Sequence, residues 1–148
     1  MRKIILLAVY SLLLASCGNA LADGNTNADL KVIVKGFDAP TGSVRVAVFD
    51  SKKEFPYGKH VAEAMIDVNG IPTNQAVSTT FNLSTGRYVV AIIHDRNNNG
   101  KMDMTMICIP TERYGFSQNP GFTLGAPSFD KVAIDLKQEG TEITVILK

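Results

Sequence analysis

The clearest chemical pattern lies in the segment His94 to Asp103 (HDRNNNGKMD). From Asp95 onward, oxygen-bearing side chains recur at every second position, and a glycine stands sixth, where a calcium loop needs a sharp turn. A hard cation binds about six to eight oxygens, and a tightly wound loop turns alternate side chains toward it. The spacing therefore predicts a calcium site formed by Asp95, Asn97, Asn99, Lys101 (through its carbonyl) and Asp103.

The same segment departs from an EF-hand in two respects. Met106 stands at the twelfth position, where an EF-hand has a glutamate that binds calcium through both oxygens. An apolar strand, not a helix, precedes the loop. Since Asp95 and Asp103 are the only carboxylates, the predicted affinity is weak, in the class of extracellular modules. The competing interpretation is an Asx-rich turn whose side chains bond to their own backbone.

His94 and Asp95 are adjacent, and a histidine beside a carboxylate can act as a general base in a hydrolase. However, no serine or cysteine has the sequence context of a nucleophile, and His60 lies far away in a polar segment. We therefore expect His94 to be a structural hydrogen-bonding residue, and we assign no catalytic residue. A hydrolase that uses His94 and Asp95 stays open as an alternative.

Residues 110–129 (PTERYGFSQNPGFTLGAPSF) form a long connection rich in glycine and proline. A loop of this length in a compact domain is uncommon and often functional. Its aromatic residues predict either a groove for a small ligand or, as the favoured interpretation, a cover over one end of the domain. They are Tyr114, Phe116, Phe122 and Phe129. Cys108, just before this loop, is expected to be a small buried residue and not a reactive thiol.

Strands must position these segments, because the hydrophobic pattern has a period of two almost throughout the chain. Val44, Val46 and Val48, for example, alternate with Ser43, Arg45 and Ala47. The segment 87–94 is apolar on both faces, which is typical of a central strand. The predicted strands are 30–35, 43–48, the second half of 61–68, 76–83, 87–94, 104–109, 129–137 and 142–148.

Two connections have the chemistry of hairpin turns, namely Gly36–Gly42 and Asn69-Gly70, and Gln138–Gly140 is predicted to be a turn between the last two strands. About seven to eight short strands without a long helix predict an all-β fold. We expect a single antiparallel β-sandwich of the immunoglobulin-like or transthyretin-like Greek-key type. Tyr88, two residues after Gly86, is placed to bond back to the preceding loop as a tyrosine corner.

The N-terminus has the three parts of a secretory signal peptide. Arg2 and Lys3 form the basic start, Ile4–Ala15 is apolar, and small residues follow. An apolar run of about a dozen residues is too short to span a hydrocarbon core of about 30 Å as a helix. The protein is therefore predicted to be exported, without a permanent membrane helix.

Leu14–Cys17 (LASC) looks like a bacterial lipobox, in which the cysteine is lipidated and becomes the first residue. Gly18 after the cysteine favours the outer membrane. The predicted organisation is a signal peptide at 1–16, a flexible tether at 17–28 with a lipid anchor on Cys17, and a sandwich domain at 29–148. A competing site after Ala22 would release a soluble periplasmic or secreted protein that starts at Asp23.

Removal of Arg2 and Lys3 leaves 13 basic residues against 14 acidic ones. Such a near-neutral chain has no electrostatic reason to bind nucleic acid. Once Cys17 is lipidated or removed, Cys108 has no partner, so we expect neither an intrachain disulfide nor a cysteine metal site. Calcium is the only cofactor that the residues predict.

Three motifs in this order, LSTGRYVVAIIHDRNNNGKMD, IPTERYGFS and GAPSFDKVAIDL, resemble the uncharacterised bacterial family catalogued as domain of unknown function 2141. The resemblance runs from Leu30 to the C-terminus and implies an exported protein without an assigned activity. A glycine usually stands in that family where this chain has Cys108, which implies a local variation there.

Three functions follow from these observations. We expect an exported, non-enzymatic module of the cell envelope that binds a partner protein or a glycan. Calcium would stabilise it through the 95–103 loop. The first alternative is a small-ligand carrier that uses Tyr114, Phe116 and Phe122. The second alternative is the hydrolase described above.

Overall fold

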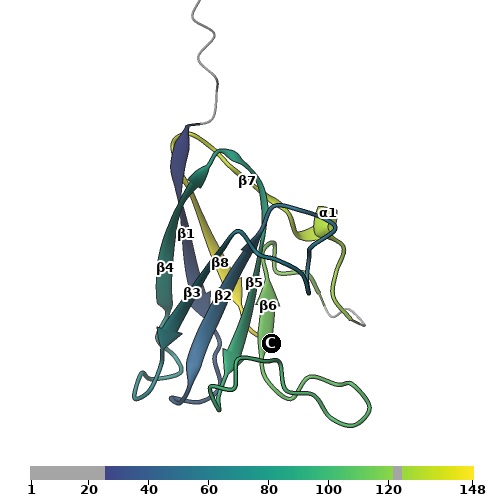
Figure 1. Cartoon of the computed structure of the whole chain (residues 1–148). Helices are drawn as coiled ribbons and strands as arrows, with labels where there is room; N and C mark the ends of the chain where they lie inside the picture. Colours follow the sequence, from purple (N-terminus) through teal and green to yellow (C-terminus); the bar gives the residue numbers. More distant parts are fainter. Residues whose placement is uncertain (1–25, 122–124) are drawn as a thin grey trace, which may run out of the picture.

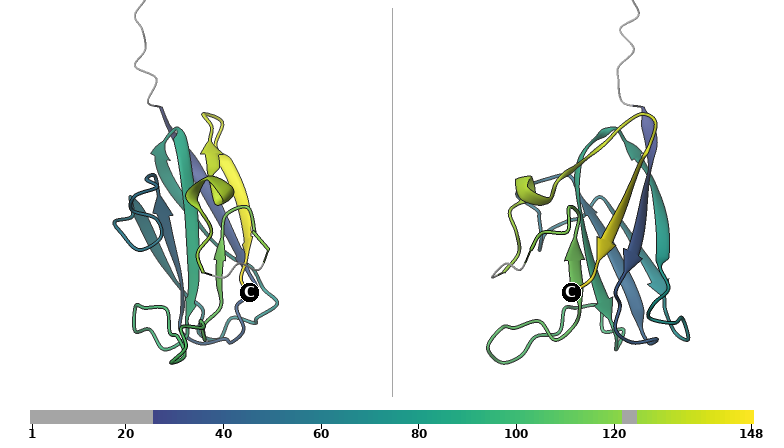
Figure 2. Two further views of the ribbon diagram at one scale, coloured as in Figure 1. Left: turned by 90° about the vertical axis from the view of Figure 1, so that its right-hand side faces the viewer. Right: turned by 180° about the vertical axis from the view of Figure 1, so that it is seen from behind.

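The computed structural model describes residues 26–121 and 125–148, so the predicted signal peptide and Cys17 lie outside the described part. Two sheets face each other, which confirms the predicted all-β, two-layered fold (Figures 1 and 2). One sheet has the order β4-β1-β8, and the other has the order β3-β2-β5-β6, with β7 also paired to β5. The elements are β1 (Asn27–Lys35), β2 (Ser43–Phe49), β3 (Ala62–Asp67), β4 (Val77–Ser84), β5 (Gly86–Asp95), β6 (Tyr114–Phe116), α1 (Phe129–Val132), β7 (Ile134–Leu136) and β8 (Thr141–Ile146).

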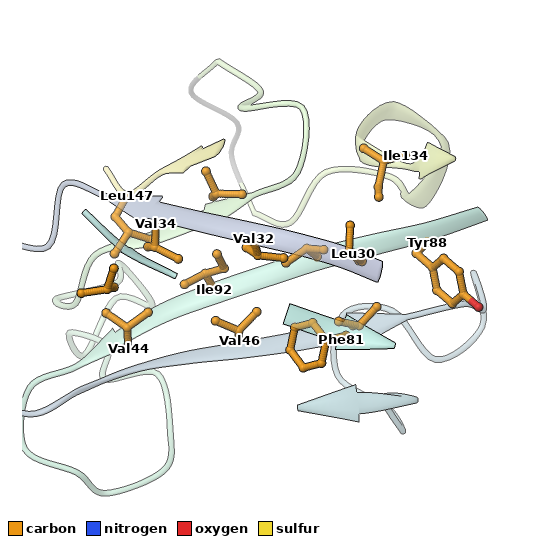
Figure 3. Packing of buried hydrophobic residues seen from close by; sticks show 14 of the residues in the cluster. Leu30, Val32, Val34, Val44, Val46, Phe81, Tyr88, Ile92, Ile134 and Leu147 are labelled. Atoms are coloured by element: carbon orange, nitrogen blue, oxygen red, sulfur yellow. The ribbon is translucent and has the colours of Figure 1, made fainter. Parts of the chain in front are cut away.

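The main core lies between the two sheets, and it follows from the period-two pattern (Figure 3). Strand β1 points Leu30, Val32 and Val34 inward, and β2 does the same with alternate valines. A side chain on a strand faces the opposite side from its neighbours, so one face of each sheet is buried and the other is more polar. This burial provides the main stabilisation of the fold.

Strand β5 is buried on both faces, as predicted for a central strand. Val90 and Ile92 belong to the main core, while Val89 belongs to a second apolar cluster on the other face of the sheet. The short helix α1 and the connection between β2 and β3 cover that face with Phe129 and Phe55. The strand that ends at Asp95 is therefore held from both sides.

The two predicted hairpins are wrong, whereas the predicted turn at 138–140 is present between β7 and β8. Strand β1 pairs with β4 and β8, whereas β2 pairs with β3 and β5, so residues 36–42 cross from one sheet to the other. The turns before β4 and before β8 cross between the sheets in the same way. Turn glycines such as Gly36 and Gly140 do have positive φ angles. A reversal of the chain thus forms where predicted, but it does not decide which sheet receives the next strand.

The pairing of the first and last strands is a further correction. Strands β1 and β8 are parallel, with Leu30 opposite Thr141 and Val34 opposite Val145, so the sandwich is not purely antiparallel. The backbones of Tyr114 and Lys148 exchange hydrogen bonds of 3.2 and 3.0 Å, which join β6 to the end of β8. The two sheets are therefore linked along this side.

Two predicted strands have different structures. Residues 104–109 form an exposed loop with a single bridge between Met104 and Pro110, because no neighbouring strand is available to them. The segment 129–137 divides into α1 and the short β7. Strand β6 lies inside the predicted long loop, and β1 begins at Asn27 within the predicted tether. Asn27 joins the sheet because its side chain bonds to Asn82 and Ser84.

The bond predicted for Tyr88 is present. Its hydroxyl donates a hydrogen bond of 2.8 Å to the carbonyl of Ser84 at the end of β4. Burial, followed by the nearby charge of Asp50, raises the pKa of Tyr88. The bond ties the turn between β4 and β5, which belong to different sheets.

Candidate functional site

The loop that follows β5 is built on the carboxylate of Asp95, which is fully buried. Arg45 Nε on β2 and the backbone N–H of Gly100 each donate to its Oδ2 at 2.8 Å, and the N–H of Asn99 donates to Oδ1 at 3.0 Å. Burial alone would raise the pKa of Asp95, but the bonds from Gly100, Arg45 and Asn99 together outweigh it and lower that pKa. Asp95 therefore serves as an ionised anchor for the loop.

The other predicted calcium ligands lie together in the same loop. Asn97 Nδ2 and Asn99 Nδ2 each donate to Asp103 at 2.7 Å. The side-chain oxygens of the two asparagines accept from backbone N–H groups, including that of Lys101 at 2.8 Å. These are the contacts of an Asx-rich turn.

Calcium binding would require a rearrangement of these contacts. The Arg45 guanidinium would have to leave Asp95, and both amides would have to turn their oxygens inward. Within residues 26–121 and 125–148, no three His, Cys, Asp or Glu side chains are grouped closely enough to hold a metal ion. The calcium site stays a prediction.

Glu112 is a functional residue that the sequence analysis did not identify. Its buried carboxylate accepts the N–H of Arg96 at 2.9 Å and the N–H of Asp103 at 3.1 Å. It thereby connects the start and the end of the 95–103 loop to the segment that leads into β6. The only sequence signal is a charged residue between apolar segments, which does not reveal its distant partners.

Beyond this base, residues 104–109 project from the end of the sandwich, and we call them the apolar finger (Figures 1 and 2). Met106 is 103% exposed and Ile107 is 76% exposed, while Met104 and Ile109 are about half exposed. The finger has internal backbone bonds, from Thr105 N to the Ile109 carbonyl at 2.8 Å and from Cys108 N to the Thr105 carbonyl at 2.9 Å. It is thus an ordered turn that presents apolar side chains to solvent.

Cys108 lies in this finger and is exposed, so the expectation of a buried cysteine is wrong. Its φ of 59° lies in the left-handed region, which is where a glycine would be favoured. Cys108 is the fourth residue of the turn 105–108, which its N–H closes by bonding to the Thr105 carbonyl. At this projecting position its side chain is exposed to solvent.

His94 is fully buried at the opposite face of β5 from Asp95. Its Nδ1 lies 3.0 Å from Asp38 Oδ1, and its Nε2 lies 2.9 Å from the carbonyl of Thr41. Both ring nitrogens therefore face hydrogen-bond acceptors in the 36–42 connection. No ring nitrogen is open to a substrate, and His94 and Asp95 do not converge on one point.

The aromatic residues of the 110–129 connection cover the outer face of a sheet. The ring centroids of Phe116 and Phe129 lie 5.7 and 6.2 Å from that of Phe55, in edge-to-face contacts. Beside Tyr114 and Phe116 lies a cavity of about 70 Å³, which is small against the roughly 300–1,000 Å³ of typical ligand pockets. Phe122 lies outside the described residues.

Comparison with known proteins assigns the chain to a family, but that family has no assigned activity. A family model described as "uncharacterized protein conserved in bacteria (DUF2141)" matches residues 32–144. No curated protein and no solved structure gives a significant match to the chain.

Proposed function

The chain belongs to the DUF2141 family of uncharacterized bacterial proteins, which brings no assigned activity, and we propose its function from the sequence and the site. The protein is an exported, non-enzymatic binding module of the cell envelope, and its binding surface is the apolar finger. Neither alternative function gains support from the geometry. The nitrogens of His94 are both occupied, and the cavity beside Tyr114 is small.

The exposure of the finger carries this proposal. Soluble proteins seldom present large apolar side chains together, and such a patch marks a surface of interaction. Met106 and Ile107 at the tip are the most exposed of these side chains, and Met104 and Ile109 flank them. The buried carboxylates of Asp95 and Glu112 hold the base of the finger in place. A loop positioned by a rigid scaffold is where binding residues usually lie.

The proposal includes export by the signal peptide at 1–16 and a lipid anchor on Cys17, which rest on the sequence alone. The anchor would hold the protein at the outer membrane or the periplasmic face, and cleavage before Asp23 would give a soluble protein instead. Within the described residues, no helix is long and apolar enough to cross a membrane. We also propose that the fold is of the immunoglobulin-like or transthyretin-like Greek-key type, and a solved structure of a relative would test this.

Site-specific photocrosslinking in intact bacteria tests the binding surface. A photoreactive residue in place of Ile107 should form adducts with envelope components, whether these are proteins, glycans or lipids. The matched control carries the same residue in place of Tyr57, which is 85% exposed on a different connection. Equal adduct formation at the two positions would remove the finger from consideration as the binding surface.

A further inference from the structure

The finger is free of charge along its whole length, and cations flank it. Residues 104–111 contain no Asp, Glu, His, Lys or Arg, whereas Lys101 and Arg113 stand on the two sides and are exposed. The nearby acids are already engaged, because Asp103 accepts bonds from two amides and Glu112 is buried. Arg113 pairs with Asp38 at 3.5 Å and donates to the Gly36 carbonyl at 3.2 Å, which leaves the exposed Lys101 as the cation for an external anion. An apolar tip with an exposed lysine at its base complements an apolar layer bordered by phosphate groups.

Three backbone N–H groups of the finger are satisfied within it. Thr105, Cys108 and Ile109 donate their N–H groups within the finger, the last of them to Thr105 Oγ1 at 3.1 Å. The hydroxyl of Thr105, the only hydroxyl between Met104 and Pro110, is therefore used as well. Unsatisfied polar groups are costly in hydrocarbon, so these internal bonds reduce the cost of insertion.

The dimensions of the finger fit the boundary of a bilayer better than a protein interface. From the Met104–Pro110 bridge to Met106 the chain can rise by at most about 7 Å, at the roughly 3.3 Å per residue of an extended chain. Amphipathic segments insert their apolar face by about 5–10 Å. A stable protein interface uses about 20–30 residues on each side, far more than the residues 104–109 provide.

We infer that the surface bound by the apolar finger is a lipid bilayer, into which Met106 and Ile107 insert while Lys101 contacts lipid phosphates. This inference rests on the proposed function and specifies its partner. Insertion is shallow and reversible, and it requires no helix and no change in the fold.

Cys108 provides a reporter at the site of insertion. The sequence has only two cysteines, so in the protein without its signal peptide (residues 17–148) a Cys17→Ala exchange leaves Cys108 as the single thiol for an environment-sensitive fluorophore. With vesicles of phosphatidylethanolamine and phosphatidylglycerol, its emission should shift to the blue and be quenched by lipids labelled in the acyl chain. The control carries the fluorophore at position 65, through Met65→Cys with Cys108→Ser, on the exposed face of β3. The emission of this control fluorophore should not change when vesicles are added.

A double substitution tests the side chains themselves. Met106→Asp with Ile107→Asp should lower the partition coefficient for these vesicles by about a hundredfold or more. Both side chains are exposed, so the variant should fold normally, which circular dichroism checks. The matched control Tyr57→Asp with Met65→Asp should leave insertion of the position-108 fluorophore unchanged.

The outcomes separate this inference from the proposed function. A fluorophore at position 108 that stays in water, or equal shifts at positions 108 and 65, would overturn the bilayer as the partner. If the residue at position 107 nevertheless forms protein adducts in cells, the finger is a binding surface for a protein. If it forms none, both proposals fail.

Discussion

Two buried carboxylates act on the backbone of the 95–112 loop, and neither is free for other chemistry. Asp95 accepts three hydrogen bonds, and Glu112 accepts two. Buried charges are tolerated when hydrogen bonds replace the lost water, which is the situation of both residues. At the scale of single residues, acidic side chains in this loop therefore hold the structure together.

Substitution of Asp95 by Asn should lower stability by about 2–3 kcal/mol at neutral pH, because it leaves Arg45 without its partner. The folded-state pKa of Asp95 is lowered, so its contribution is present above the unfolded value of about 3.9 and is lost as pH falls through the lower folded value. The variant should accordingly lose less of its remaining stability on acidification than the parent protein. Urea unfolding at neutral and acidic pH measures both effects.

Asp135→Asn is the control for this prediction, because Asp135 is exposed on β7. It should change stability by no more than about 0.5 kcal/mol. An Asp95→Asn variant as stable as this control would contradict an anchoring role for Asp95.

At the scale of elements, the 36–42 connection is fitted against the start of the 95–103 loop. A Cβ on Gly42 would lie 2.2 Å from the carbonyl oxygen of Asp95 and 2.6 Å from the Cα of Arg96. The neighbouring His94 bonds to Asp38 and Thr41 of the same connection. The crossing between the sheets and the base of the finger are therefore one packed unit.

Gly42→Ala tests this contact against a matched position. Gly42 and Gly70 have nearly the same φ, 78° and 77°, but nothing lies within 4 Å of a Cβ on Gly70. Gly70→Ala should cost about 1 kcal/mol for the left-handed backbone alone. Gly42→Ala should cost about 3 kcal/mol or more, because backbone atoms must also move. Equal losses in urea unfolding would show that the close approach does not matter.

The calcium prediction belongs to the loop as a whole. Because Arg45 must be displaced, we expect calcium to raise the Tm only at millimolar concentrations, as in weak extracellular sites. Thermal unfolding with calcium and with chelator measures this, and Asp103→Ala should abolish the shift. A Tm that is the same in calcium and in chelator, or a Tm shift that persists in Asp103→Ala, would show that the 95–103 loop is not a calcium site.

The strand positions could be predicted because alternation is a local property, and the apolar faces of β1, β2 and β5 follow from it. The pairing of strands could not, since Gly36 and Gly42 favour a reversal whether the next strand joins the same sheet or the facing one. Residues 104–109 are apolar enough for a strand, but no neighbour pairs with them. At the site, the loop could be predicted from its local spacing. The bond from Arg45 to Asp95 could not, because the two residues are 50 positions apart in the sequence.

At the scale of the whole molecule, the finger and the start of β1 lie at opposite ends of the sandwich (Figure 1). The described chain enters at one end with Asn27, while the 95–112 loop extends beyond the other ends of β2 and β5. A protein held by its N-terminus would therefore direct the finger away from the point of attachment. This arrangement allows the anchor and the finger to act on separate surfaces.

The parallel pairing of β1 with β8 also has a kinetic consequence. The first strand of the domain gains its second neighbour only when the last strand has been synthesised, since Leu30 lies opposite Thr141. Pairings this distant in sequence must close a long loop before any contact rewards it, and they slow folding. The valines of β1 stay uncovered on that side until Val145 and Leu147 arrive. The sheet β4-β1-β8 is therefore completed only after β8 has been synthesised, so β1 is the first strand made and among the last to be fully paired.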